Sequence, residues 1–248
     1  MMRYTTFIFD LDGTLLDTLN DLAASVNYAL RQHGMAEHPT DDIRRFVGNG
    51  VRLLMQRAVP ADTPQELFEA AYATFRQHYM EHSMDTTRPY DGIPETLSEL
   101  RRRGCRIAVV SNKMQAATQK LVAHFFPDIP VAIGENEAAG IRKKPAPDTV
   151  FEALRQLEAL PAPAPLQPAS APPQPASAPL QPAPSRMLRL SRNPHPIYVG
   201  DSDVDILTAR NASLPCISVL WGFRSRQFLI DHGATNLVAA PAELIAFT

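Results

Sequence analysis

A short stretch near the start of the chain constrains the fold more than any other. Residues 7–14 read Phe-Ile-Phe-Asp-Leu-Asp-Gly-Thr, so two carboxylates, Asp10 and Asp12, follow an apolar run of strand length. Such a run, ending in a glycine-containing turn, indicates a buried parallel strand and the loop at its carboxyl end, where ligands bind in open α/β sheets. Two carboxylates crowded there repel each other unless a cation or a proton neutralises them. The motif therefore predicts a metal ion with hard oxygen ligands, Mg²⁺ above all.

Two later segments also place polar residues after apolar runs. Ser111 and Asn112 follow the run 105–110, where a hydroxyl can donate a hydrogen bond to a phosphate oxygen. Taken singly, a serine in this place is more often a turn residue or a helix cap. Lys143 and Lys144 precede a Pro-Ala-Pro turn. A lysine there can stabilise phosphoryl charge as a compact cation, and a solvated charged loop is the alternative.

A fourth segment repeats the arrangement of the first. Residues 196–200 form an apolar run that ends in glycine, and Asp201 and Asp205 come after it. If a helix begins there, the spacing of four places both carboxylates on one helix face. Asp203 lies between them, and an acidic first turn of a helix is a sufficient reason for its presence.

These four segments, in this order, resemble the motifs of the haloacid-dehalogenase superfamily of phosphohydrolases. The first matches Asp-x-Asp-Gly-Thr, the third matches Lys-Pro-x-Pro through Lys144 rather than Lys143, and the fourth matches Gly-Asp-x-x-x-Asp through Asp201 and Asp205. The resemblance covers nearly the whole chain except residues 159–195.

The resemblance implies a role for each residue of the phosphoryl site. Asp10 would be the nucleophile that forms an aspartyl-phosphate intermediate, and Asp12 would be the general acid and base. Ser111 and Lys144 would hold the phosphoryl oxygens, with Asn112 beside them in the substrate site.

The resemblance also implies a Mg²⁺ site. Its ligands would be the Asp10 carboxylate, the main-chain carbonyl of Asp12 and the Asp201 carboxylate, while Asp205 would orient water ligands or ligate indirectly. Dehalogenase relatives lack the second aspartate of the first motif. Asp12 therefore favours phosphoryl over halide chemistry.

Apolar runs alternate with helical patterns along the chain, which predicts an α/β fold with a doubly wound parallel sheet, a Rossmann-like core. Strands are expected near residues 4–10, 105–110, 130–133, 196–200 and 215–219. The helical patterns of residues 16–88 resemble the α-helical cap that one large subgroup of the superfamily inserts after its first motif. The predicted units are therefore a catalytic core of residues 1–15 and 89–248 and a cap that excludes water from the phosphoryl intermediate.

A loop inside this cap carries Gly48, Asn49 and Gly50, and its glycines let the backbone approach a ligand closely. Val-Gly-Asn-Gly before an apolar helix is similar to the cap loop of phosphoglycolate phosphatases, which implies that these three residues contact substrate. Arg52, just beyond them, can bind a substrate carboxylate. Arg52 could instead lie on a solvated helix face, and the glycines could simply separate two helices.

Residues 159–196 break the alternation. A repeat of Gln-Pro-Ala-Ser-Ala-Pro begins at Gln167 and again at Gln174. Proline-rich sequence of this kind can neither form a strand ladder nor bury much apolar surface, which predicts a disordered or polyproline-like insertion within the core. The insertion is either an inert spacer or, through its Pro-x-x-Pro spacing, a weak docking segment for a partner.

Composition excludes several classes of protein. The net charge of −2 gives no electrostatic case for nucleic acid or an anionic membrane. No apolar run approaches the roughly 20 residues needed to span a bilayer. Cys105 and Cys216 lie in apolar runs, which is typical of core residues in a reducing compartment. The first strand begins so early that no signal peptide is expected, which predicts a cytoplasmic location. The protein is expected to be a monomer or a homodimer.

Together these features predict a Mg²⁺-dependent phosphomonoesterase of a small anionic metabolite, with 2-phosphoglycolate favoured by the resemblance of the cap loop. A phosphosugar mutase shares Asp10, Asp12 and a cap, but it returns the phosphoryl group to the substrate. A phosphatase of a different small phosphoester, such as a sugar phosphate, a nucleotide or pyrophosphate, is also compatible with the motifs. So is a binding module that recruits a partner through the proline-rich segment.

Overall fold

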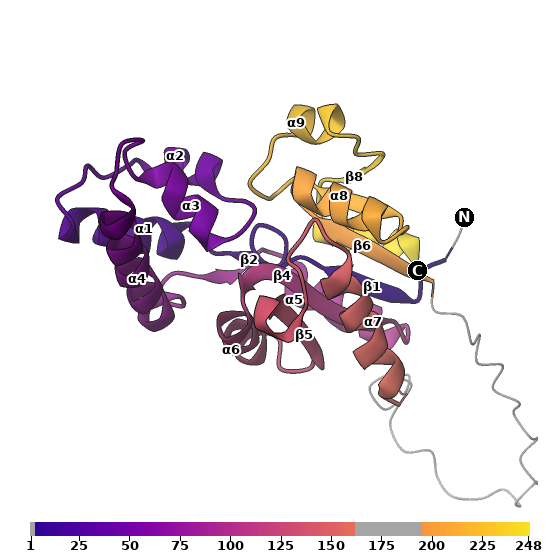
Figure 1. The fold of residues 1–248 in the computed structure, drawn as a ribbon. Helices are drawn as coiled ribbons and strands as arrows, with labels where there is room; N and C mark the ends of the chain where they lie inside the picture. Colours follow the sequence, from indigo (N-terminus) through magenta and orange to yellow (C-terminus); the bar gives the residue numbers. More distant parts are fainter. Residues whose placement is uncertain (1–2, 162–194) are drawn as a thin grey trace, which may run out of the picture.

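A computed structural model of the chain describes residues 3–161 and 195–248. Its centre is a parallel sheet of six strands in the order β5-β4-β1-β6-β7-β8 (Figure 1). The strands are β1 (Thr6–Phe9), β4 (Arg106–Met114), β5 (Val131–Glu135), β6 (Pro196–Gly200), β7 (Cys216–Val219) and β8 (Asn236–Val238).

Both faces of the sheet are covered by helices, and successive side chains of each strand point to opposite faces. In β1, Phe7 and Phe9 belong to one hydrophobic cluster, whereas Ile8 belongs to another. The first cluster includes residues of α5 (Ile93–Arg102), α6 (Gln115–Phe125) and η2 (Pro241–Phe247). The second includes residues of α7 (Asp148–Ala159) and α8 (Asp203–Asn211). The predicted doubly wound parallel fold is thereby confirmed.

The order of the strands places a topological switch point at β1. After β1 the chain forms β4 and β5 on one side and then returns to form β6, β7 and β8 on the other. In register, Phe7 lies opposite Ile107 of β4 and Ile197 of β6. The residues that follow β1 and β6 therefore come together at the carboxyl edge, where open α/β sheets bind ligands.

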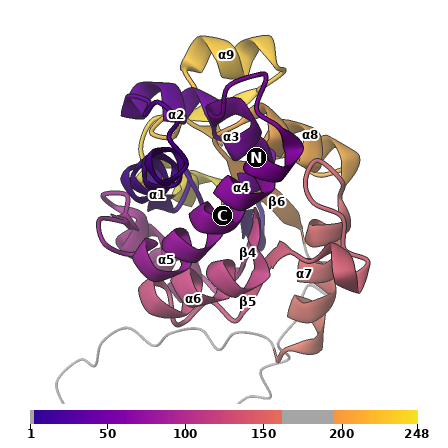
Figure 2. The ribbon, with the colours of Figure 1, turned by 60° about the vertical axis from the view of Figure 1, so that its left-hand side comes forward.

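Four of the five helices between β1 and β4 form a separate lobe, here called the cap (Figures 1 and 2). They are α1 (Leu19–Gln32), α2 (Thr40–Phe46), α3 (Val51–Ala58) and α4 (Gln65–His82). They enclose a third hydrophobic cluster, with Phe75 and Tyr79 of α4 fully buried in it. A short antiparallel ribbon of β2 (Leu16–Asp17) and β3 (Arg88–Pro89) forms the connection to the core.

The structure differs from the sequence-based expectation in several local features. Strand β4 continues beyond residue 110, with a register irregularity against β5 between Val110 and Met114, so Ser111 lies within the strand rather than after it. Strand β8, the β2–β3 ribbon and the short helix α9 (Arg226–Asp231) were not expected. Most of the predicted proline-rich insertion, 162–194, lies outside the described residues. Within residues 3–161 and 195–248, no helix combines the length and the apolar character needed to cross a membrane.

Candidate active site

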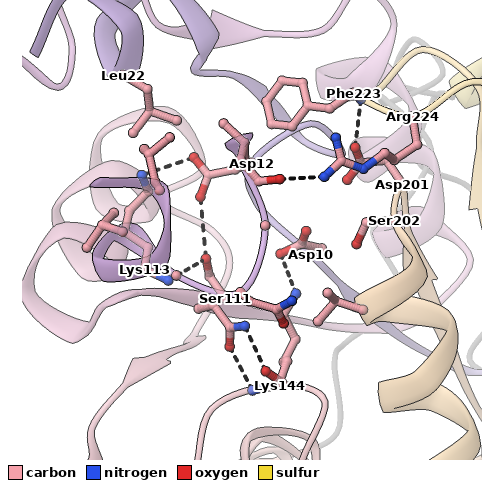
Figure 3. A pocket seen from close by; sticks show the side chains of 18 residues that line it. Asp10, Asp12, Leu22, Ser111, Lys113, Lys144, Asp201, Ser202, Phe223 and Arg224 are labelled. Atoms are coloured by element: carbon pink, nitrogen blue, oxygen red, sulfur yellow. Dashed lines mark hydrogen bonds and ion pairs between the residues drawn. The ribbon is translucent and has the colours of Figure 1, made fainter. Parts of the chain in front are cut away.

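The carboxyl ends of β1, β4 and β6 meet the cap at one pocket (Figure 3). Asp10 and Asp12 follow β1, Ser111 lies in β4, and Asp201 follows β6. Residues 47–51 of the cap line the same pocket. Sequence segments that are far apart in the chain are thus brought together at the switch point.

Asp10 and Lys144 form an ion pair that is almost fully buried. The Asp10 carboxylate is 2.7 Å from Lys144 Nζ, and the two residues are 7% and 3% exposed. Burial raises the pKa of Asp10 well above its ordinary value, the nearby Asp205 raises it further, and the Lys144 ammonium opposes both effects. Burial disfavours the charged form of Lys144, but its two carboxylate neighbours outweigh that cost and raise its pKa. Lys144 is therefore a fixed cation beside Asp10.

Asp205 orients this lysine. Its side chain is fully buried and accepts hydrogen bonds at Oδ1 from Lys144 Nζ, at 2.8 Å, and from the Tyr198 hydroxyl, at 2.9 Å. Its other oxygen accepts from the main-chain N–H and the hydroxyl of Ser202, in a capping box at the start of α8. Both oxygens of Asp205 are thus already engaged by protein groups.

Asp201 lies close to Asp10 and Asp205 and is held by two donors. The Thr14 hydroxyl donates to Oδ1 at 3.2 Å, and the main-chain N–H of Phe223 donates to Oδ2 at 2.7 Å. Burial, followed by the charge of Asp205, raises the pKa of Asp201 to about 7. Without a further cation, this carboxyl is therefore only partly ionised at neutral pH.

Two glycines make room for the Asp201 carboxylate. A Cβ atom on Gly222 would lie 2.3 Å from Asp201 Cβ and 2.4 Å from the Gly13 carbonyl oxygen. A Cβ atom on Gly13, whose φ is +84°, would lie 2.5 Å from Asp201 Oδ2. These distances are shorter than any van der Waals contact. The loops after β1 and β7 can therefore enclose Asp201 only if residues 13 and 222 are glycine.

The three carboxylates fit a divalent cation. Asp10, Asp201 and Asp205 each offer an oxygen, and these oxygens lie within 4.8 Å of one another. Buried carboxylates whose pKa values are raised gain most from a hard cation that neutralises them, and the donor set is entirely oxygen. Since Asp205 is already engaged by Lys144, Tyr198 and Ser202, Asp10 and Asp201 are the better placed to ligate directly.

Asp12 lies in the same pocket but has different partners. Its Oδ1 accepts a hydrogen bond from the Thr18 hydroxyl at 2.6 Å and lies 3.0 Å from Lys113 Nζ. The Ser111 hydroxyl is 3.5 Å from the other oxygen. The carboxylate of Asp12 is not in the cluster around Asp10, so the two acids of the first motif have separate electrostatic environments.

Asn112 positions Lys144 from the neighbouring strand. Its side-chain amide accepts a hydrogen bond from the main-chain N–H of Lys144 at 2.7 Å and donates to the Lys144 carbonyl at 2.9 Å. Both ends of the amide are therefore used to hold the lysine loop. Ser111 lies in the pocket wall, and its hydroxyl also accepts a hydrogen bond from the Lys113 N–H at 3.1 Å.

The cap loop approaches the pocket as expected, whereas Arg52 does not. Gly48, Asn49 and Gly50 line the pocket and have φ values of 126°, 62° and 92°, a left-handed backbone that favours glycine. Arg52 is outside the pocket lining. Its guanidinium pairs with Glu69 and lies over the ring of Phe68, 4.9 Å from the centroid. The structure therefore does not place Arg52 among the residues that can contact a ligand in this pocket.

The pattern of the chain matches a known family. The model of the family described as haloacid dehalogenase-like hydrolase matches residues 7–164. The chain belongs to this hydrolase family. The first and third sequence motifs both lie inside the matched range.

The chain is similar to several phosphoglycolate phosphatases over most of its length. The chain is 28% identical to the phosphoglycolate phosphatase of Aquifex aeolicus, over 87% of this chain and 84% of the relative. It is 32% identical to the phosphoglycolate phosphatase of Rhodobacter capsulatus, over 88% and 84%. A solved structure from Lactobacillus delbrueckii, provisionally named a phosphoglycolate phosphatase, is 33% identical, has a TM-score of 0.80 and covers 99% of both chains. The predicted resemblance to capped phosphohydrolases, and the predicted enzyme class, are confirmed.

Two charged residues of the hydrolase site were missed by the sequence analysis. Lys113 is 3% exposed and links Asp12 to the hydroxyl of Tyr79 in the cap. Arg224, in the loop after β7, lines the pocket and donates hydrogen bonds to main-chain carbonyls of the cap. Lys113 follows Ser111 and Asn112 directly, a signal that was present. Arg224 had no local signal, because its place depends on the packing of two distant loops.

We predict that Gly222→Ala lowers the free energy of unfolding by about 1–3 kcal/mol, because the added methyl group overpacks the loop against Asp201. It also weakens binding of a divalent cation, measured by calorimetric titration with Mg²⁺. The matched variant is Gly104→Ala, which adds a methyl group into open space at a φ of +79°. Gly104→Ala should cost stability without changing cation affinity. Equal cation affinity in Gly222→Ala and the parent protein would contradict the assigned role of Gly222.

A second prediction concerns the stability of the hydrolase in a chelator. The pKa of Asp201 is raised to about 7 in the folded state and is about 3.9 when unfolded, so the folded state binds the proton more tightly. The stabilising contribution is therefore present below pH 4 and is lost as the pH rises through 7. Asp201→Asn should flatten this decline in a series of thermal unfolding curves between pH 5 and pH 8. Parallel curves for the variant and the parent would contradict the raised pKa.

Proposed function

We propose that this enzyme is a Mg²⁺-dependent phosphomonoesterase that acts through an aspartyl-phosphate intermediate and converts 2-phosphoglycolate to glycolate and phosphate. The observation that carries the proposal is the separation of two carboxylates in one pocket. Asp10 is paired with Lys144, whereas Asp12 is held by Thr18 and Lys113. One acid can thus act as a nucleophile and the other can transfer protons.

In the first half of the reaction, a carboxylate oxygen of Asp10 attacks the phosphorus atom. The bond between phosphorus and the ester oxygen breaks, and its electron pair leaves with the alkoxide. Protonated Asp12 donates its proton to that oxygen, so the product leaves as a neutral alcohol group. Lys144 and the Ser111 hydroxyl lie in the same pocket as charge-stabilising donors for the phosphoryl oxygens.

In the second half, a water molecule attacks the phosphorus atom of the aspartyl phosphate. Asp12, now ionised, accepts a proton from that water, while the bond between phosphorus and the Asp10 oxygen breaks. Inorganic phosphate forms, the Asp10 carboxylate is restored and Asp12 is again protonated. The cap loop lines the pocket, where it would limit the access of other water to the intermediate.

Asp10 and Asp201 would hold the Mg²⁺ ion, with the main-chain carbonyl of Asp12 as the ligand that the family resemblance adds. Bound there, the cation neutralises phosphoryl charge that would otherwise repel the Asp10 nucleophile. Asp205 acts on Lys144 rather than on the cation, because its two oxygens accept four protein hydrogen bonds.

The assignment of 2-phosphoglycolate is supported by the relatives in Aquifex aeolicus and Rhodobacter capsulatus, which are named for that substrate. The pocket beside the cap loop is lined by the cationic side chains of Lys113, Lys144 and Arg224, which suits a small anionic phosphoester. We further propose that the enzyme acts in the cytoplasm as a monomer or homodimer, without nucleic acid or membrane partners. The proline-rich segment, as a spacer or a docking segment, takes no part in the proposed chemistry.

A substrate panel tests this proposal. Phosphate release is measured with and without Mg²⁺ for the parent enzyme, Asp10→Asn and the exposed control Asp62→Asn. We expect Mg²⁺-dependent turnover with 2-phosphoglycolate preferred, a loss of at least about 10³-fold in Asp10→Asn, and no change in Asp62→Asn. Preference for another ester would remove the substrate assignment, an isomerised sugar phosphate would indicate a mutase, and no turnover would refute the proposal.

The proposed role of Asp12 as a proton donor can be tested with two substrates whose leaving groups differ in their need for a proton. Asp12→Asn should lower kcat for 2-phosphoglycolate, whose alkoxide needs a proton, by about 10²–10⁴-fold. The rate of phosphoenzyme formation from p-nitrophenyl phosphate should fall far less, since its phenolate leaves without protonation. Rapid-quench measurement of nitrophenol release separates this step from hydrolysis of the intermediate. An equal loss with both leaving groups would show that Asp12 is not the acid.

A further inference from the structure

Three cationic side chains line the pocket, and two of them are neutralised by carboxylates of the site. Lys113 pairs with Asp12, and Lys144 pairs with Asp10 and Asp205. The third is Arg224. Among residues 3–161 and 195–248, the structure records no ion pair between Arg224 and a carboxylate, so its charge is available to a ligand.

The guanidinium of Arg224 is fixed in place by the cap. Nη1 donates to the Arg44 carbonyl at 3.1 Å, and Nη2 donates to the Val47 carbonyl. A Cβ atom on Gly48 would lie 3.2 Å from Nη2, so the group packs directly against the cap loop. The planar fork is therefore oriented before any ligand arrives, which lowers the entropy cost of binding an anion.

One donor of this guanidinium has no protein partner. Nε of Arg224 is buried and makes no hydrogen bond within the described part of the chain. A buried cationic N–H without an acceptor is unfavourable, and such groups call for an explanation. Arg224 thus lines the pocket with a guanidinium whose hydrogen-bonding capacity the described part of the chain does not fully use.

Arg224 and the phosphoryl-binding residues lie apart in the pocket. In the view of Figure 3, Arg224 and Lys144 lie on opposite sides of Asp10. A substrate whose phosphoryl group is at Asp10, beside Lys144, would thus have its other end toward the cap loop and Arg224. Gly48 lies at the Arg224 end of the pocket, since a Cβ atom there would be 3.2 Å from Arg224 Nη2, and as a glycine it leaves that space free of a side chain.

We propose that Arg224 binds the second anionic group of the substrate, the carboxylate of a short phosphorylated hydroxy acid, and thereby determines specificity. This inference rests on the proposed phosphomonoesterase activity. It assigns to a core loop the role that the sequence analysis gave to Arg52 of the cap. Since the same guanidinium holds the cap through the carbonyls of Arg44 and Val47, carboxylate binding and cap position involve one side chain.

A pair of substrates tests this role. 2-Phosphoglycolate and 2-hydroxyethyl phosphate share a two-carbon skeleton, but the second has a neutral alcohol in place of the carboxylate. We expect Arg224→Gln to lower kcat/KM for 2-phosphoglycolate by about 10- to 100-fold, the effect of one charge-assisted contact, and for 2-hydroxyethyl phosphate by less than about threefold. Arg226→Gln removes the same charge from an exposed position two residues away and should change neither value.

Arg224→Lys serves as the second variant. It keeps the charge without the planar fork, so its preference for 2-phosphoglycolate should lie between those of the parent and Arg224→Gln. Thermal unfolding curves identify any loss of folding. Equal losses with the two substrates would show that Arg224 only anchors the cap loop, and would overturn the inference while the phosphomonoesterase assignment stands. If the parent enzyme hydrolyses neither ester, both the proposed function and this inference fail.

Discussion

The ion pair between Asp10 and Lys144 is the interaction on which the rest of the site depends. Three carboxylates are buried within a few ångströms of one another, and burial raises the pKa values of Asp10 and Asp201. Lys144 offsets part of this repulsion because it contacts Asp10 and Asp205 together. The repulsion that remains between the carboxylates favours binding of a divalent cation, since a metal ion that binds there removes an electrostatic cost already present in the fold.

The surrounding structure keeps this crowded arrangement in place. Asn112 holds the main chain of Lys144 with two hydrogen bonds, and Asp205 is itself held at the start of α8. Gly222 lets two loops close around Asp201. These supports come from different strands, and the parallel sheet aligns all of their carboxyl ends at one edge. The fold thus serves to bring groups together that would separate in a flexible chain.

The sequence predicted the parts of the site that are encoded locally. Asp10 and Asp201 were found because each follows an apolar strand, and strand ends converge in this fold class. Arg52 was expected near the ligand from its place after the cap loop, but the helix directs it to Glu69. Arg224 was not found, since its position results from contact between a core loop and the cap. Strand periodicity carries no information about such long-range contacts, and side-chain direction on a short helix depends on its packing.

Trapping the phosphoryl group on the enzyme tests the role of Asp10 without an intermediate assumption. Parent enzyme mixed with Mg²⁺ and 2-phosphoglycolate is quenched in acid within one turnover, digested and mapped by mass spectrometry. We expect one phosphoryl group on the peptide that contains Asp10, localised to Asp10, and none when Asp10→Asn is treated in the same way. Release of glycolate and phosphate without a modified peptide, or with the phosphoryl group on another residue, would contradict the assignment of Asp10 as the nucleophile.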